Sequence, residues 1–152
     1  MNPLCPTNFN YLENFMDDRR PLPVFTETYE CSNEFYPTDN SIYIYGETDE
    51  QRSHHINDWG QLKAIQTIKV TGICDNSNII KIDDTEISLR SSRELATIWD
   101  GYPEKIKVYI DITGLSHSAW AGLIKSAVDK NFKVCAVYVE PQDYNLGENR
   151  YP

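Results

Sequence analysis

KVYIDITGLSHSAWAGLIKSAVDKNFKVCAVYVE, residues 107–140, decides the fold class of this chain. It opens with KVYIDIT, whose apolar and β-branched residues predict a buried strand, and closes with KVCAVYVE, which predicts a second strand ended by Pro141. Between them, apolar residues recur at the spacing of one helix face: Trp120, Leu123, Ile124, Ala127 and Val128. A helix between two buried strands is typical of a βαβ unit, in which the strands are parallel.

Residues 41–74 show the same alternation. SIYIYG (41–46) and TIKVTGIC (67–74) predict strands. We expect a helix between them that starts near residues 50–53, because apolar residues recur at helical spacing: Ile56, Trp59, Leu62 and Ile65.

Residues 78–103 connect these two regions. NIIKIDDTEISLRS (78–91) predicts two short strands around a turn at Asp83-Asp84, and Ser91 and Glu94 have the spacing of a capping box at a helix start. Strands that alternate with amphipathic helices predict an α/β fold, here a Rossmann-like three-layer sandwich with a mostly parallel sheet. Residues 1–40, rich in proline and aromatic residues, are expected to form an extended N-terminal arm, partly irregular, before a domain of residues 41–152.

The composition narrows the class of protein. The chain has 152 residues, with 14 basic and 23 acidic side chains and a net charge of −9, so extended nucleic acid is not an expected partner. It contains no apolar run of about 18 residues and no N-terminal signal pattern, so we expect a cytoplasmic protein without membrane contact. The cysteines lack metal-ligand spacing, and Cys74 and Cys135 are expected to be small buried hydrophobic residues. No metal and no cofactor is predicted.

Ligands in open parallel sheets bind beyond the carboxyl ends of the strands. Three predicted strands end in polar or ionisable residues that we expect at one edge of the sheet. These candidate residues are Glu50, Arg52 and Ser53 after the first strand, Asp111, Thr113, Gly114, Ser116 and His117 around the end of another, and Glu140 and Tyr144 after the last.

Arg52 is the candidate for holding an anion, because its planar guanidinium matches phosphate or carboxylate; the alternative is a surface pair with Glu47 or Glu50. The sequence leaves open which of these two acids matters. Asp111 either accepts hydrogen bonds from a neighbouring loop or orients a ligand hydroxyl or a basic partner. His54 and His55 are expected on a helix surface.

Gly114 and Ser116 offer backbone N–H groups and a hydroxyl at a helix start, which is a common anion site; the alternative is that Ser116 is only an N-cap. His117 in the first turn is expected to act as a neutral imidazole or to be a surface residue. Glu140 is either a catalytic or ribose-binding carboxylate or a partner of Arg52 or Lys133. The chain has neither a GxGxxG nor a GxxxxGK[ST] motif.

The ExRS run after the first strand, DITGLSH after a later one and YVEPQDY after the last resemble Rossmann-like domains of bacterial anti-phage and conflict systems, distantly similar to the CARF and TIR groups. This resemblance covers residues 41–145. It implies a glutamate and arginine after the first strand (Glu50, Arg52), an aspartate-hydroxyl turn (Asp111, Thr113, His117) and a glutamate-tyrosine pair (Glu140, Tyr144).

Three functions follow. The first is a nucleotide- or phosphate-ligand-binding sensor or regulatory domain in bacterial antiviral defence, working with a protein partner or as a homo-oligomer. The second is an enzyme that cleaves a nucleotide N-glycosidic or phosphodiester bond, with Asp111, His117 and Glu140 as catalytic residues. The third is a protein-interaction subunit of a larger complex.

Overall fold

The computed structural model describes residues 26–72 and 78–141. The chain divides into two units, Met1–Tyr36 and Pro37–Pro152. Of the first unit, the structure describes residues 26–36, where a 3₁₀ turn, η1, spans Ser32–Glu34 and Cys31 is disulfide-bonded. Most of the predicted arm lies outside the described residues. The fold and the candidate site below belong to the second unit.

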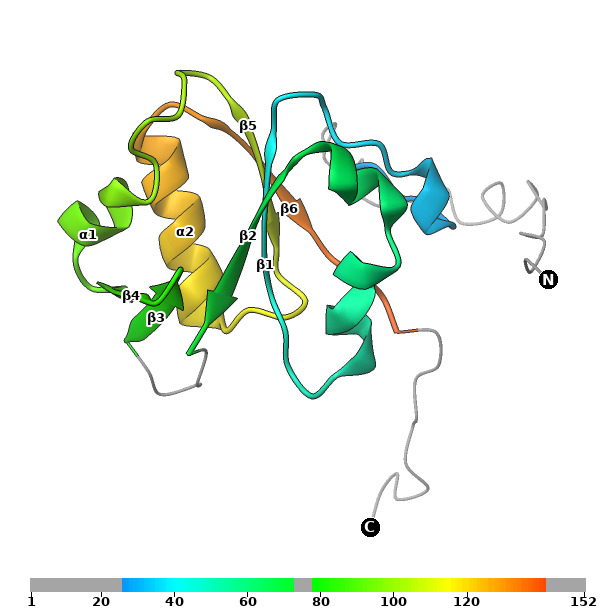
Figure 1. The fold of residues 1–152 in the computed structure, drawn as a ribbon, viewed down its shortest axis with the longest axis horizontal. Helices are drawn as coiled ribbons and strands as arrows, with labels where there is room; N and C mark the ends of the chain where they lie inside the picture. The colour runs from blue at the N-terminus through cyan, green and yellow to red at the C-terminus, as the bar shows by residue number, and fades with distance from the viewer. Residues whose placement is uncertain (1–25, 73–77, 142–152) are drawn as a thin grey trace, which may run out of the picture. The chain divides into compact units, whose positions relative to one another are not determined.

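The second unit is an α/β fold built on a mixed sheet whose strand order is β4-β3-β2-β1-β5-β6 (Figure 1). β2, β1, β5 and β6 are mutually parallel, whereas β3 is antiparallel to β2 and to β4. The sheet is therefore parallel only over its four-strand side. The strands are β1 (Ile42–Gly46), β2 (Gln66–Thr71), β3 (Ile79–Ile82), β4 (Thr85–Ser88), β5 (Lys107–Asp111) and β6 (Lys133–Val137).

Two α-helices, α1 (Ser92–Thr97) and α2 (His117–Asp129), lie on one side of the sheet in Figure 1, and the 3₁₀ helices η2 (Gln51–Asn57) and η3 (Gly60–Ala64) lie on the other. The predicted β5-α2-β6 unit is confirmed, since β5 and β6 are adjacent and parallel. The hairpin turn is also confirmed: Asp83 and Asp84 both have positive φ, 48° and 62°, as a tight hairpin requires. Ser91 caps α1 as predicted, and its side chain accepts from the Glu94 N–H.

The two faces of the central strands carry different chemistry because side chains alternate along a strand. Ile42, Ile44, Val108 and Ile110 belong to one aliphatic core, which α1 and α2 also line. Tyr43, Tyr109 and Asp111 alternate with them and are also buried. The 3₁₀ side of the sheet thus has a core of polar-tipped side chains.

Two predictions about local structure are wrong. The single helix expected from residue 50 is instead the pair η2 and η3, separated where Trp59 leaves helical backbone geometry (ψ 88°) between Asp58 and Gly60, both poor helix formers. Cys135 is only partly buried, because β6 is the edge strand of the sheet. Cys74 lies outside the described residues.

Candidate functional site

The strand order defines a switch point between β1 and β5. From β1 the chain crosses to β2 on one side, whereas β5 continues to β6 on the other, and ligands in open α/β sheets bind at such a point. Because β1, β5 and β6 are parallel neighbours, their carboxyl ends share one edge, as predicted. We call the segments that follow these three strands, residues 47–53, 112–117 and 138–141, the rim.

Arg52 joins two segments of the rim. Its Nε donates to Glu50 Oε2 over 2.6 Å, and its Nη1 donates to the Tyr138 hydroxyl over 2.7 Å and to the Val139 carbonyl over 3.0 Å. Its guanidinium carbon lies 5.1 Å from the centre of the Tyr138 ring. The pairing of Arg52 with Glu50 is therefore present. With 24% of its side chain exposed, the guanidinium is still accessible from solvent.

Asp111 lies beneath the rim, in a buried polar cluster with Tyr43 and His55. Its side chain is fully buried, and its Oδ1 accepts from the Thr113 N–H over 2.8 Å, as expected for a carboxylate that holds a loop. Its Oδ2 has no hydrogen-bond partner and lies 3.4 Å from His55 Nε2. Burial raises the pKa of Asp111, while His55, Thr113 and Arg52 oppose that rise.

His55 is buried, with 6% of its surface exposed, so its predicted place on a helix surface is wrong. Its Nδ1 lies 3.0 Å from the Arg52 carbonyl oxygen, which only accepts, so Nδ1 carries a proton. Its Nε2 lies 2.8 Å from the Tyr43 hydroxyl and also faces Asp111 Oδ2. The Tyr43 hydroxyl, which can donate to Nε2, is the group within hydrogen-bond distance of that nitrogen.

Tyr43 completes this cluster from β1. Its ring stacks on Tyr109 with centroids 6.5 Å apart, and burial, followed by the charge of Asp111, raises the pKa of its hydroxyl. The phenol therefore stays protonated. The cluster connects β1, β5 and η2 directly below the rim.

Ser53 shapes the loop between β1 and η2. Its fully buried hydroxyl accepts from the Thr48 N–H over 3.0 Å and donates to the Glu50 carbonyl over 2.7 Å. Both bonds are internal to the loop. Ser53 thus positions Glu50 and Arg52 from below, and its hydroxyl is not available to a ligand.

At the switch point, the backbone after β5 packs closely against the backbone at the end of β1. A Cβ built on Gly114 would overlap the carbonyl oxygen of Gly46 and lie 2.7 Å from its carbonyl carbon. The segment after β5 therefore packs directly on the end of β1. Thr113 extends this contact to the segment that follows β6, because its Oγ1 accepts from the Val139 N–H over 2.9 Å.

The remaining predicted residues lie apart from this cluster. Ser116 is the N-cap of α2 and accepts from the Ala119 N–H; His117 is exposed, and its ring neighbours Trp120 at 5.8 Å. Glu140 is exposed and forms no ion pair with any described residue. Tyr144 lies outside the described residues. The structure thus brings together Glu50, Arg52, Ser53, Asp111, Thr113 and Gly114, but joins neither His117 nor Glu140 to them by a hydrogen bond or ion pair.

Sequence reasoning missed three residues of this region: Tyr43, His55 and Tyr138. The sequence did contain a signal for Tyr43. It alternates with aliphatic residues along its strand, as Tyr109 does, and this pattern places both tyrosines on the opposite face of the sheet from the aliphatic core. No sequence signal separated His55 from His54, which is exposed and contacts the Thr48 carbonyl. Which of the two histidines is buried depends on which side of η2 packs against the sheet.

Within the described parts of the chain, no group of three or more His, Cys, Asp or Glu side chains is placed to hold a metal ion. None of the helices in residues 26–72 and 78–141 has the length and apolar character that a membrane crossing needs. The structure defines the class of protein as an α/β domain with a mixed sheet and a polar rim at its switch point. No protein-family model, no curated protein and no solved structure matches this chain.

Ser53→Ala is expected to lower the free energy of unfolding by about 1–2 kcal/mol, because the Thr48 N–H loses its acceptor and the Glu50 carbonyl loses a donor. Urea denaturation measures this loss. Ser118→Ala is the matched control, since Ser118 is exposed and its hydroxyl contacts that of Ser116 at 3.3 Å. Equal stability losses in the two variants would contradict a role for Ser53 in holding the loop.

Proposed function

We propose that this protein is a Rossmann-like domain that binds a nucleotide or another phosphate-bearing small ligand at the rim, and acts as a sensor or regulatory domain. The observation that carries the proposal is Arg52, which stands at the switch point with a partly exposed guanidinium held by two rim segments. A guanidinium fixed by neighbours loses little side-chain freedom when it binds an anion. Its planar array of donors suits a phosphate group.

Tyr138 supports a nucleotide over a bare anion. Tyr138 is 50% exposed, and the guanidinium of Arg52 lies over one face of its ring. An exposed aromatic ring offers a stacking surface for a base, at a cost in side-chain entropy that is small for tyrosine. Glu50, exposed on the same loop, accepts hydrogen bonds and is suited to a ribose hydroxyl.

The acids close to Arg52 set the expected strength of binding. Glu50 already forms an ion pair with the guanidinium, and the whole chain carries a net charge of −9. An incoming phosphate must displace or share that partner. We therefore expect micromolar rather than nanomolar affinity, and weaker binding at high salt.

Binding is favoured over turnover by the positions of the three candidate catalytic residues. Asp111 is fully buried with one oxygen committed to Thr113, whereas His117 and Glu140 are exposed and make no hydrogen bond or ion pair with Asp111 or with each other. General acid–base catalysis needs such groups within reach of one reacting atom. Cleavage of a nucleotide bond stays a prediction from the sequence, and nothing in this geometry adds to it.

The biological role proposed here, a sensor in a bacterial defence system that works with a protein partner or a second copy, rests on the sequence resemblance alone. A sensor needs two conformations that a ligand distinguishes. Arg52 could link ligand binding to a change of conformation, because a ligand at its guanidinium competes with its hydrogen bonds to Tyr138 and Val139. Release of those bonds would free the segment that follows β6.

Arg52→Ala is expected to weaken nucleotide binding at least tenfold, because the phosphate loses its charged, bidentate partner. Thermal shift against mono-, di- and cyclic nucleotides and NAD identifies the ligand, and titration calorimetry on the best one measures affinity. Arg90→Ala is the matched control, since it removes the same charge from an exposed turn after β4.

Two results would overturn this function. One is that no nucleotide in the panel stabilises the wild-type protein. The other is that Arg52→Ala and Arg90→Ala weaken binding equally, which would mean that overall charge rather than the rim holds the ligand. Chromatography of the incubated nucleotide tests turnover directly, and Glu140→Gln should leave binding unchanged.

A further inference from the structure

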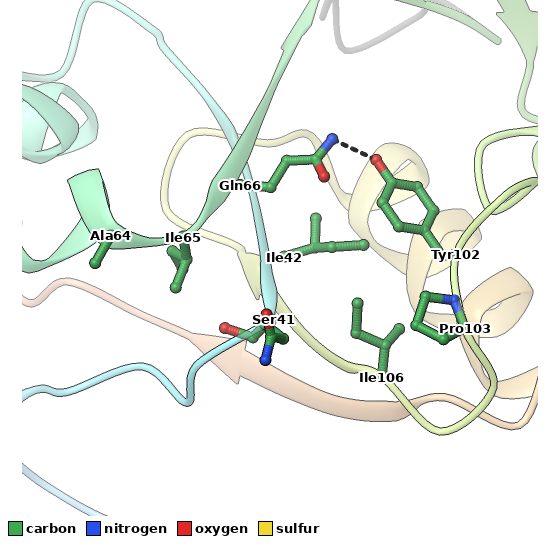
Figure 2. Close-up of a pocket in the computed structure, with 9 residues that line it drawn as sticks. Ser41, Ile42, Ala64, Ile65, Gln66, Tyr102, Pro103 and Ile106 are labelled. Atoms are coloured by element: carbon green, nitrogen blue, oxygen red, sulfur yellow. Dashed lines mark hydrogen bonds between the residues drawn. The ribbon is translucent and has the colours of Figure 1, made fainter.

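A hollow lies at the other edge of the sheet, away from the rim. It is a pocket of about 510 Å³ lined by nine residues, drawn in Figure 2. Among them Ser41, Ile65 and Ile106 directly precede β1, β2 and β5. These three strands are parallel neighbours, so their starts share the edge opposite the rim. This amino-edge pocket is separate from the site proposed above.

The lining of the amino-edge pocket carries no charged side chain. Charged residues make up 24% of the chain, yet none of them lines this hollow. A charged ligand would lose hydration there without gaining a counter-charge. The occupant that fits is therefore neutral.

The walls of the pocket are apolar and face one another. Figure 2 shows Ala64 and Ile65 on one side and Pro103 and Ile106 on the other, with Ile42 between them. Ile65 and Ile106 are only partly buried, so the free protein leaves apolar surface in contact with water. A ligand with a flat apolar body would cover both walls and gain from removing that surface from water.

Polar groups stand at defined points of this apolar hollow. The Gln66 amide donates to the Tyr102 hydroxyl over 2.6 Å, so the Gln66 carbonyl and the Tyr102 ring are fixed at the top of the pocket in Figure 2. Ser41 lines the pocket, is 3% exposed, and has a buried hydroxyl oxygen with no hydrogen-bond partner. A buried hydroxyl without a partner is destabilising, so a ligand that supplies a partner gains from it.

We propose that the amino-edge pocket binds a small, uncharged aromatic amide, with the aromatic ring between Ile65 and Ile106 and the amide exchanging hydrogen bonds with the hydroxyl of Ser41 and the side-chain carbonyl of Gln66. An amide carries both an acceptor and a donor, which matches a hydroxyl on one side and a carbonyl on the other. The proposal requires that the Ser41 hydroxyl turn toward the pocket, which a change of its χ1 rotamer would achieve without backbone movement. The volume lies in the range of small-ligand sites.

Benzamide is the probe for this proposal, and benzoate is its charged counterpart of nearly equal shape. Titration of the full-length ¹⁵N-labelled protein with benzamide should give saturable shifts of the backbone amides of Ser41, Gln66 and Tyr102, with a Kd of about 1 mM for a molecule of this size. Benzoate should bind at least tenfold more weakly. The amides of Arg52 and Tyr138 at the rim should not shift, which separates this test from that of the proposed function.

Two variants test the assigned contacts. Ala64→Phe fills the pocket from an exposed wall position and should weaken benzamide at least tenfold, whereas Ala121→Phe, the same change at an exposed position of α2, should not. Ser41→Ala removes the unpartnered hydroxyl, so it should leave the melting temperature unchanged or higher while weakening benzamide about threefold or more. Absence of saturable shifts in the wild-type protein, equal binding of benzoate, or unchanged benzamide affinity in Ala64→Phe or Ser41→Ala would overturn the proposal.

Discussion

Gly114→Ala is expected to lower the free energy of unfolding by at least about 3 kcal/mol, or to prevent folding. The new methyl group would overlap the Gly46 carbonyl oxygen, lie 2.7 Å from its carbon and lie 3.0 Å from Ser53 Cβ. Two of these atoms are backbone atoms at the end of β1, a strand paired on both sides, so they cannot move without disturbing the sheet. Overpacking against fixed backbone is among the most destabilising small changes.

Gly60→Ala is the matched control for this substitution. A Cβ on Gly60 has no heavy atom within 4 Å, and this glycine opens η3. We expect a change of no more than about 1 kcal/mol, in either direction, because alanine reduces the freedom of the unfolded chain without a clash. Urea denaturation of both variants, followed by circular dichroism, measures the difference. Equal stability of the two variants would show that the contact between Gly114 and Gly46 does not hold in solution.

Asp111→Ala is expected to cost about 3–5 kcal/mol of unfolding free energy. The substitution removes the acceptor of the Thr113 N–H, leaves His55 Nε2 without its acidic neighbour and opens a cavity in a fully buried position. Asp111→Asn should cost only about 1 kcal/mol, since the amide oxygen still accepts from Thr113 and the amide nitrogen donates to His55. Chemical denaturation at neutral pH compares the two. A larger loss in Asp111→Asn than in Asp111→Ala would contradict this account of the cluster.

The pH dependence of the same pair has a definite sign. Burial raises the pKa of Asp111 above its ordinary value of about 3.9, so the folded protein binds this proton more tightly than the unfolded chain does. The resulting stabilisation is complete below about pH 3.9 and is lost as the pH rises through the higher pKa of the folded state. Wild-type stability minus that of Asp111→Asn should therefore fall as the pH rises from 4 to 7.5. An increase over this range would mean that the pairing with His55 outweighs burial.

The sequence predicted the strands and α-helices well, because the spacing of apolar residues within each segment is characteristic of a strand or of a helix. The stripe from Trp120 to Val128 predicted α2, and the apolar runs on either side predicted β5 and β6. The region from Glu50 to Ile65 was predicted less well, since its apolar spacing fits a helix while Asp58 and Gly60 interrupt one. Periodicity reports which residues face the core, not which type of helix carries them.

The candidate site was also predicted only in part from the sequence. That Asp111 and Arg52 would lie at one edge followed from the rule that parallel strands end together, and the strand order confirms it. The hydrogen-bond and ion-pair partners of Asp111 and Arg52 could not be predicted. For Arg52, the alternative partners differ only in the direction that its side chain takes. The structure selects Glu50 together with Tyr138, and places His55 rather than His54 beside Asp111.

By itself, the sequence determined the α/β class, the β5-α2-β6 unit, the hairpin at Asp83-Asp84 and the residues that follow each strand, because all of these depend on local periodicity and turn chemistry. Only the tertiary structure decided that β3 and β4 make the sheet mixed, that Gly114 packs on Gly46, and that the amino-edge pocket has an uncharged lining. Each of these depends on pairing between segments distant in the chain. Such pairing is set by the packing of the whole sheet, which no short stretch of sequence encodes.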